Sequence, residues 1–105
     1  MTTLSTHVLD TAAGQPARGV RVLLEPRMGQ AWQLAKVVTP GDDGRVDGFG
    51  DLEPGYYRLT FDAAGYFAET AFFPEIIVSF DLRGDEHHHV PLLMSPFSYT
   101  TYRGS

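Results

Sequence analysis

Apolar and polar residues alternate with a period of two along much of this chain. In residues 4–10, Leu4, Thr6 and Val8 fall on one side of the alternation and His7 falls on the other. Such alternation is typical of a strand with one buried face, because successive side chains of a strand point to opposite sides. This segment is therefore predicted to form a strand that buries Val8 and directs His7 away from it.

The same alternation recurs between Gly- and Pro-rich turns, which predicts short strands at regular spacing. One short helix is predicted over residues 63–71, because Asp62 can cap its first turn and Pro74 stops it. Residues 87–105 are predicted to form a hairpin about Ser95 and Pro96, with a second strand that runs to the chain end. This pattern predicts an all-β fold, an antiparallel β-sandwich with one short helix. The other predicted strands are residues 20–25, 31–39, 45–47, 56–61 and 76–82.

Size and charge narrow the class of protein. With 105 residues and 43% hydrophobic residues, the chain is expected to form a single domain over residues 1–105. The net charge of −5 argues against a nucleic-acid partner, because such proteins need a basic face. The chain has no cysteine, no signal-peptide pattern at its start and no apolar run near the ~18 residues of a membrane span. We therefore expect a cytoplasmic protein that does not bind membranes.

The residues best suited to catalysis are histidines and one arginine. His87 and His89 are two apart and are predicted to share one strand face, while His88 lies on the other. His7 lies on another strand face, and Arg45 follows a dense turn. Neutral histidine is a general base near pH 7, and arginine binds anions or stabilises an oxyanion. Without cysteine or a G-x-S-x-G motif, direct attack by water is favoured over a covalent intermediate.

Each of these residues also has an ordinary structural explanation. A single histidine on a strand is more often a hydrogen-bonded structural residue, and Arg45 after a turn is by default a solvated charge. Three consecutive histidines can be a surface tract or an adventitious metal patch. Alternatively, His7, His87 and His89 can supply three nitrogen ligands to a catalytic zinc ion. From the residues alone, the function stays open.

Several segments form a set that spans residues 4–105. The most specific are HHHVPLL at residues 87–93 and TYRGS at residues 101–105, and the others are residues 4–10, 43–45, 72–76 and 95–96. Together they resemble the transthyretin-like 5-hydroxyisourate hydrolases. The resemblance implies a sandwich of two four-stranded sheets with one short helix, and a homotetramer whose active sites lie in a channel between dimers. It also implies hydrolysis of 5-hydroxyisourate to 2-oxo-4-hydroxy-4-carboxy-5-ureidoimidazoline in urate degradation, without a metal or other cofactor.

The resemblance assigns roles to particular residues. It implies that His89 and His7 bind and deprotonate the attacking water, without deciding which is the base, and that Arg45 holds substrate oxygens and the oxyanion. The carboxylate of Ser105, the fourth residue assigned to catalysis, is expected to bind substrate nitrogens or to orient a histidine. The residues expected to bind the substrate are Tyr102, Arg103, Gly104 and His87.

Two features of this chain depart from the pattern of the family. The family usually has Tyr where this chain has His88, and we expect tolerance because that side chain points off the site face. The turn at Phe97 and Ser98 also lacks the glycine often found there. A ligand carrier such as transthyretin shares the fold but lacks the His/Arg set and the TYRGS end, and a purely structural sandwich does not explain that end.

Overall fold

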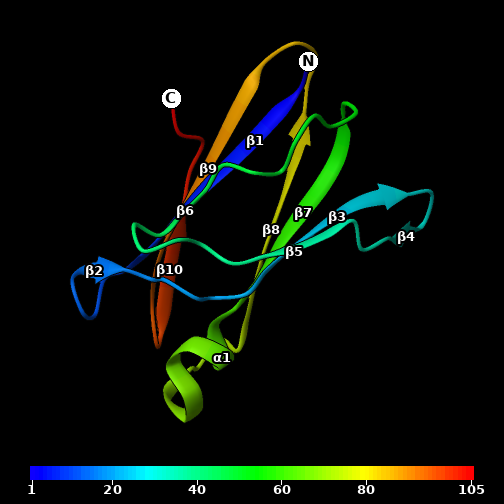
Figure 1. Cartoon of the computed structure of the whole chain (residues 1–105). Helices are drawn as coiled ribbons and strands as arrows, with labels where there is room; N and C mark the ends of the chain where they lie inside the picture. Colours follow the sequence, from blue (N-terminus) through cyan, green and yellow to red (C-terminus); the bar gives the residue numbers. More distant parts are fainter.

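The computed structural model describes all of residues 1–105 as a sandwich of two β-sheets (Figure 1). In Figure 1 the helix lies at one end of the sandwich and both chain termini lie toward the other. The elements are β1 (Thr3–Asp10), β2 (Gln15–Pro16), β3 (Val22–Met28), β4 (Ala31–Trp32), β5 (Lys36–Val38), β6 (Arg45–Val46), β7 (Gly55–Asp62), α1 (Ala63–Phe67), a 3-10 turn (Ala68–Thr70), β8 (Glu75–Leu82), β9 (His87–Ser95) and β10 (Ser98–Thr101).

The predicted all-β sandwich with one short helix is confirmed, with two refinements in the pairing. One sheet has the order β10-β9-β1-β2 and the other β4-β3-β7-β8, and each gains a short fifth strand, β6 on β1 and β5 on β3. Most neighbours are antiparallel, but β1 and β9 run parallel, with Ser5 opposite His89. This pairing joins the two ends of the chain, so the histidine segment lies directly beside the first strand.

The prediction of one strand over residues 31–39 is wrong. Two short strands, β4 and β5, pair with different parts of β3, with Trp32 opposite Arg27 and Lys36 opposite Leu24. Residues 33–35 between them are not part of a strand, although the backbone N–H groups of Gln33 and Ala35 still donate to carbonyls of β3. The strand predicted over residues 20–25 also begins and ends later, at Val22–Met28.

The predicted helix is present but shorter than residues 63–71. Its N-terminus is capped as expected, because the Asp62 carboxylate accepts a hydrogen bond of 3.0 Å from the Gly65 N–H. The α-helix ends at Phe67, and Ala68 takes a left-handed conformation with φ of 58°. That conformation breaks the helix well before Pro74.

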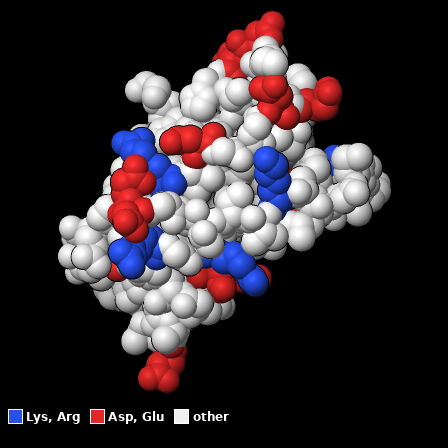
Figure 2. All heavy atoms as spheres, in the orientation of Figure 1, with Lys and Arg blue, Asp and Glu red and all other residues white.

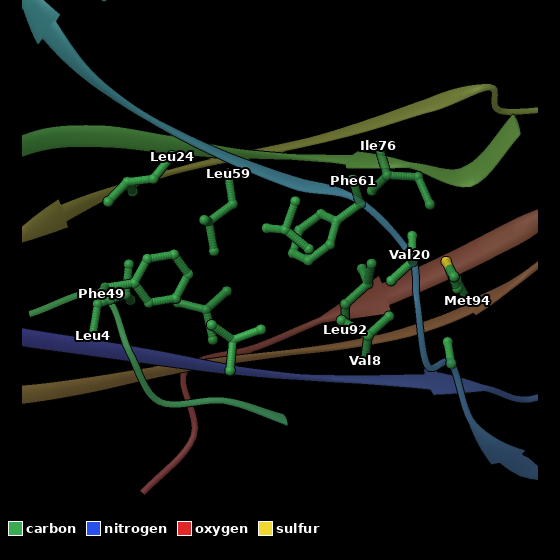
Figure 3. Packing of buried hydrophobic residues seen from close by; sticks show 14 of the residues in the cluster. Leu4, Val8, Val20, Leu24, Phe49, Leu59, Phe61, Ile76, Leu92 and Met94 are labelled. Atoms are coloured by element: carbon green, nitrogen blue, oxygen red, sulfur yellow. The ribbon is translucent and has the colours of Figure 1, made fainter. Parts of the chain in front are cut away.

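The hydrophobic core determines which side chains remain on the outer face of the first sheet. Seventeen buried hydrophobic residues form one cluster between the sheets, with Leu4, Val8 and Leu92 facing Leu59 and Phe61 (Figure 3). Because strand side chains alternate, burial of these residues turns the intervening residues of β1 and β9 away from the core. The outward residues include Ser5 and His7 on β1 and His87 and His89 on β9.

The charged side chains are spread over the surface. On the face drawn in Figure 2, Lys and Arg lie singly or in small groups among Asp and Glu, with no continuous basic area. No helix in the structure has both the length and the apolar character needed to cross a membrane.

Two glycines with left-handed conformations provide a matched test of close packing. Gly44 and Gly14 have φ of 79° and 70°, but only at Gly44 would a Cβ meet another atom, 2.4 Å from the Val8 carbonyl oxygen. Gly14→Ala should lower the free energy of unfolding by about 1 kcal/mol through backbone strain alone. Gly44→Ala should lower it by about 3 kcal/mol or more, because β6 must also move away from β1. Urea denaturation measures both, and equal losses would contradict the close approach.

Candidate active site

The candidate site lies on the outer face of the first sheet, where β9, β1 and β6 run side by side. Their register sets Ser5 opposite His89 and His7 opposite Arg45. Beside these residues the surface forms an open hollow of about 400 Å³ with no hydrophobic side chain in its lining. The lining residues are Ser5, Arg45, Asp47, His87, His89 and Ser105.

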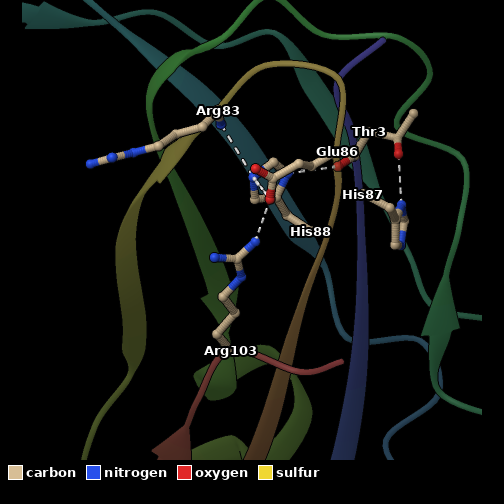
Figure 4. Close-up of polar contacts among 6 residues, drawn as sticks. All are labelled: Thr3, Arg83, Glu86, His87, His88 and Arg103. Carbon is tan, nitrogen blue, oxygen red and sulfur yellow. Dashed lines mark hydrogen bonds and ion pairs between the residues drawn. The ribbon is translucent and has the colours of Figure 1, made fainter.

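A buried serine holds the two outward histidines of β9. The Ser5 hydroxyl oxygen lies 2.8 Å from Nε2 of His87 and 2.7 Å from Nδ1 of His89. The Thr3 hydroxyl lies 2.7 Å from the other nitrogen of His87 (Figure 4). Both nitrogens of His87 are therefore occupied, whereas Nε2 of His89 has no hydrogen-bond partner in the protein. Nε2 of His89 is thus the nitrogen available to a bound molecule.

A tight turn before β6 positions the second imidazole and the guanidinium. Nε2 of His7 donates to the Asp43 carbonyl at 2.8 Å, which leaves Nδ1 of that ring as its acceptor. The Arg45 backbone N–H donates to the Asp43 carboxylate at 3.0 Å. Gly44 makes the close contact with β1 that brings this turn against the sheet. His7 lies next to the hollow rather than in its lining.

The C-terminal segment turns back across His89 instead of continuing as a strand. β10 ends at Thr101, and the Gly104 N–H donates to the His89 carbonyl at 2.8 Å. A Cβ at Gly104 would lie 2.6 Å from Cδ2 of His89, so this contact requires glycine. The predicted second strand of the hairpin is therefore too long. The turn still places Ser105, with its terminal carboxylate, at the hollow.

Tyr102 and Arg103 do not face this hollow. The Arg103 guanidinium donates to the Glu86 carboxylate at 2.8 Å, on the side of β9 away from His87 (Figure 4). Both residues instead line a second cavity of about 230 Å³ beside β8 and β9, which His88 and His89 also line. Among the tail residues predicted to bind substrate, Gly104 is the one that packs against the ring of His89.

His88 points into the protein, as its place in the alternation predicts. Its ring is buried, its Nδ1 donates to the Thr3 carbonyl at 3.3 Å, and its Nε2 accepts from the Arg83 N–H at 3.2 Å (Figure 4). The Glu86 carboxylate lies 3.9 Å from the same Nε2. A neutral His88 thus has a partner for each ring nitrogen without entering the hollow.

Comparison with known proteins decides the family. Residues 4–104 match the model of the HIUase/Transthyretin family. The chain belongs to this family.

Individual family members match nearly all of the chain. A 5-hydroxyisourate hydrolase of Pseudomonas aeruginosa is 40% identical, over 97% of this chain and 90% of its own length. The solved structure of Klebsiella pneumoniae 5-hydroxyisourate hydrolase has a TM-score of 0.85 at 34% identity and covers 100% of both chains. Sea bream transthyretin, solved with thyroxine, has a TM-score of 0.90 at 28% identity, over 97% of this chain and 94% of its own.

In this HIUase/Transthyretin family member, the site favours the neutral form of His89. Partial burial lowers the pKa of His89 most, and its electrostatic interactions with Arg45, His7 and His87 lower it further. A hydrogen bond with the Ser5 backbone opposes these effects. His89 is therefore a neutral imidazole at neutral pH, with one ring nitrogen that can accept a proton.

The zinc alternative lacks a set of ligands in this arrangement. No three His, Asp or Glu side chains lie close enough together to hold a metal ion. Nε2 of His87 and Nδ1 of His89 both hydrogen-bond the Ser5 hydroxyl, so the serine oxygen occupies the position between these two nitrogens. The histidines of this family member form a hydrogen-bonded row instead.

Three residues of this site, Ser5, Thr3 and Asp47, are not predicted from the sequence. Asp47 carries a recoverable signal, because it lies two residues after Arg45 and alternation sets both on one face. Ser5 shares the face of His7, but its role depends on the parallel pairing with β9. No local pattern reveals that pairing.

The electrostatics of this family member predict how His89 titrates. Nuclear magnetic resonance of the ring protons should give a pKa below the usual 6.5. Arg45→Gln should raise this pKa without restoring 6.5, because burial, the larger cause, remains. Since the folded chain binds this proton more weakly than the unfolded chain, stability is lost as pH falls from 6.5 through the lowered pKa. Titration at or above 6.5 would contradict this electrostatic description.

Proposed function

We propose that this chain hydrolyses 5-hydroxyisourate to 2-oxo-4-hydroxy-4-carboxy-5-ureidoimidazoline in urate degradation. The observation that carries the proposal is the free Nε2 of a neutral His89 in a polar hollow that also holds Arg45 and the terminal carboxylate. A base, an anion-binding group and an acceptor for ring N–H groups are what hydrolysis of a cyclic amide requires. The relatives named 5-hydroxyisourate hydrolase support the substrate.

In the proposed mechanism, His89 activates water directly. Nε2 of His89 takes one proton while the water oxygen bonds to the ring carbonyl carbon. Arg45 stabilises the negative charge that develops on the carbonyl oxygen. Collapse of this tetrahedral species breaks the carbon–nitrogen bond, and His89 returns the proton to the departing nitrogen. The new carboxylic acid then ionises.

The remaining residues act around this reaction. We assign His7 to orienting the water through its free Nδ1, because Nε2 is occupied by the Asp43 carbonyl. The Ser105 carboxylate accepts hydrogen bonds from substrate nitrogens. Gly104 allows the tail to lie against His89, and the contact between Arg103 and Glu86 holds the tail in that position. Tyr102 and Arg103 thus support the pocket instead of binding the substrate within this chain.

A carrier of apolar ligands is the alternative that the fold permits, because sea bream transthyretin was solved with thyroxine. The lining of the hollow argues against it. All of its residues are polar or charged, and they include a base whose pKa is lowered. Such a lining suits a small polar heterocycle better than a hydrophobic hormone.

The proposal predicts a loss of catalysis at His89. 5-Hydroxyisourate generated from urate by urate oxidase has an ultraviolet band whose decay this chain should accelerate. His89→Gln should lower kcat by about 100-fold to 10,000-fold, because glutamine cannot serve as the base. His88→Tyr should keep the parent rate, since that side chain lies on the opposite face. The parent rate should also survive chelation of metals.

The assay separates the site from the function. Equal acceleration by the parent chain and His89→Gln would keep the enzyme but refute the assigned base. A folded parent chain without acceleration would refute the hydrolase and leave the carrier as the explanation.

We also propose that residues 1–105 act as one domain within a homotetramer. Two edge strands, β8 and β10, are open for pairing, and large aromatic residues beside them are exposed, with Phe72 and Phe97 each 73% accessible. Light scattering coupled to gel filtration should give four times the chain mass of 11.6 kDa. A monomer or a dimer at micromolar concentration would refute the tetramer.

We place this enzyme in the cytoplasm as part of the same proposal. The chain has no cysteine and therefore needs no oxidising compartment. Fractionation of source cells should recover the hydrolase with cytoplasmic markers, and recovery with membranes or secreted proteins would refute this assignment.

A further inference from the structure

Three hydrogen bonds in series connect His89 to the edge of the site. They run from Nδ1 of His89 to the Ser5 hydroxyl at 2.7 Å, from there to Nε2 of His87 at 2.8 Å, and from Nδ1 of His87 to the Thr3 hydroxyl at 2.7 Å. The parallel register of β1 and β9 alternates these four side chains along one face. His87 is exposed to solvent, whereas Ser5 is only 5% accessible. This series of hydrogen bonds, the hydrogen-bond chain, therefore leads from the hollow to water.

If His89 acts as the base, the position of every proton in the hydrogen-bond chain is determined. A neutral imidazole carries one proton, so a free Nε2 on His89 requires the proton on Nδ1, which then donates to Ser5. The Ser5 hydroxyl has one proton of its own, and it donates that proton to Nε2 of His87. His87 must then carry its proton on Nδ1, facing Thr3. One consistent orientation thus links the base to the surface.

We propose that Ser5 and His87 are positioning residues that carry a proton from His89 to solvent in each turnover. This inference rests on the proposed hydrolysis and replaces the substrate-binding role predicted for His87. With both ring nitrogens of His87 occupied by Ser5 and Thr3, neither is free for substrate.

The reaction requires such an outlet because it releases one proton. The water supplies an OH group to the carbonyl carbon and one proton to the departing nitrogen. That nitrogen becomes part of a ureido group, which is not basic enough to hold a further proton at neutral pH. The carboxylic acid formed at the carbon ionises, so its proton must leave through a group that contacts it. His89 is that group.

The charges around His89 favour passing this proton on. Partial burial opposes a positive charge on His89 most, and the Arg45 guanidinium opposes it further. The Asp47 and Ser105 carboxylates, which also line the hollow, act in the opposite direction. Nε2 of His89 faces the hollow, whereas the His87 side chain, which also lines the hollow, is exposed and directs its Nδ1 to the Thr3 hydroxyl. The hydroxyl between the two rings is therefore the direct route outward.

In the transfer, only bonds to hydrogen change. The Nδ1 proton of His89 passes to the Ser5 oxygen, and the Ser5 proton passes to Nε2 of His87. The Nδ1 proton of His87 passes to the Thr3 oxygen, and the Thr3 hydroxyl releases its own proton to water. His89 then carries its proton on Nε2. After the product leaves, water in the open hollow removes the Nε2 proton of His89. A proton from solvent then returns along the hydrogen-bond chain to Nδ1 of His89, which restores the starting orientation. The net result is one proton delivered to solvent.

Substitution of His87 separates proton transfer from structure. His87→Gln keeps groups that can hydrogen-bond to Ser5 but cannot carry a proton, so we expect kcat to fall about 10-fold or more. His87→Ala should lose a similar factor and recover most of it when imidazole is added. The parent rate should not respond to imidazole. A merely structural histidine would instead be replaced well by glutamine and would show no such recovery.

Two serine variants supply the matched comparison. Ser5→Ala removes the hydroxyl that connects His89 to His87, so the kcat of this variant should fall and should not recover with imidazole. Ser98→Ala makes the same chemical change in β10, outside the hollow, and should keep the parent rate. Parent kcat in His87→Gln, or a loss in His87→Ala that does not respond to imidazole, would overturn the proposal.

A second measurement does not depend on turnover. Nitrogen-15 chemical shifts of the neutral rings should place the proton on Nδ1 in both His87 and His89. A proton on Nε2 of His89 would overturn the orientation even in an active enzyme. If the parent chain fails to accelerate decay of 5-hydroxyisourate, the proposed function is refuted, and the tautomers still decide whether the hydrogen-bond chain exists.

Discussion

The parallel pairing of β1 with β9 is the constraint on which the rest of this structure depends. It joins the two ends of the chain over the full length of β1 and aligns Ser5 with His89. The same register buries Leu4 and Val8 from one strand and Leu92 from the other in a common core. Because alternate residues of each strand face opposite ways, packing of the core also determines the row of polar groups outside. Both the packing of the core and the arrangement of the polar site therefore depend on the pairing of β1 with β9.

The site is completed where two other segments approach this strand pair without a side chain between them. At Gly44 the turn before β6 meets the backbone of β1, and at Gly104 the tail meets the ring of His89. These contacts bring a guanidinium to one side of the histidines and a terminal carboxylate to the other. The chain thereby assembles groups of opposite charge around one neutral imidazole. These local approaches thus form the polar surface of this chain on a fold that it shares with transthyretin.

The electrostatics of the site follow from the same geometry. A cation is needed where an oxyanion forms, yet a cation beside a histidine opposes its protonation. In the proposed mechanism the two requirements agree, because the lowered pKa of His89 favours the neutral form, which is the form that accepts a proton from water. In the proposed proton transfer, the hydrogen bonds through Ser5 are the path by which that proton leaves His89.

By itself, the sequence determined the faces of the strands, the helix cap at Asp62 and, through its motifs, the family. Alternation correctly set His87 and His89 on one face and His88 on the other, because this period is a local property of an extended backbone. Only the tertiary structure decided the parallel neighbour of β1, the division of residues 31–39 into two strands and the turn of Arg103 toward Glu86. Those features depend on which distant segments pair and on where the chain end finds its partners. Local patterns carry no record of such long-range contacts.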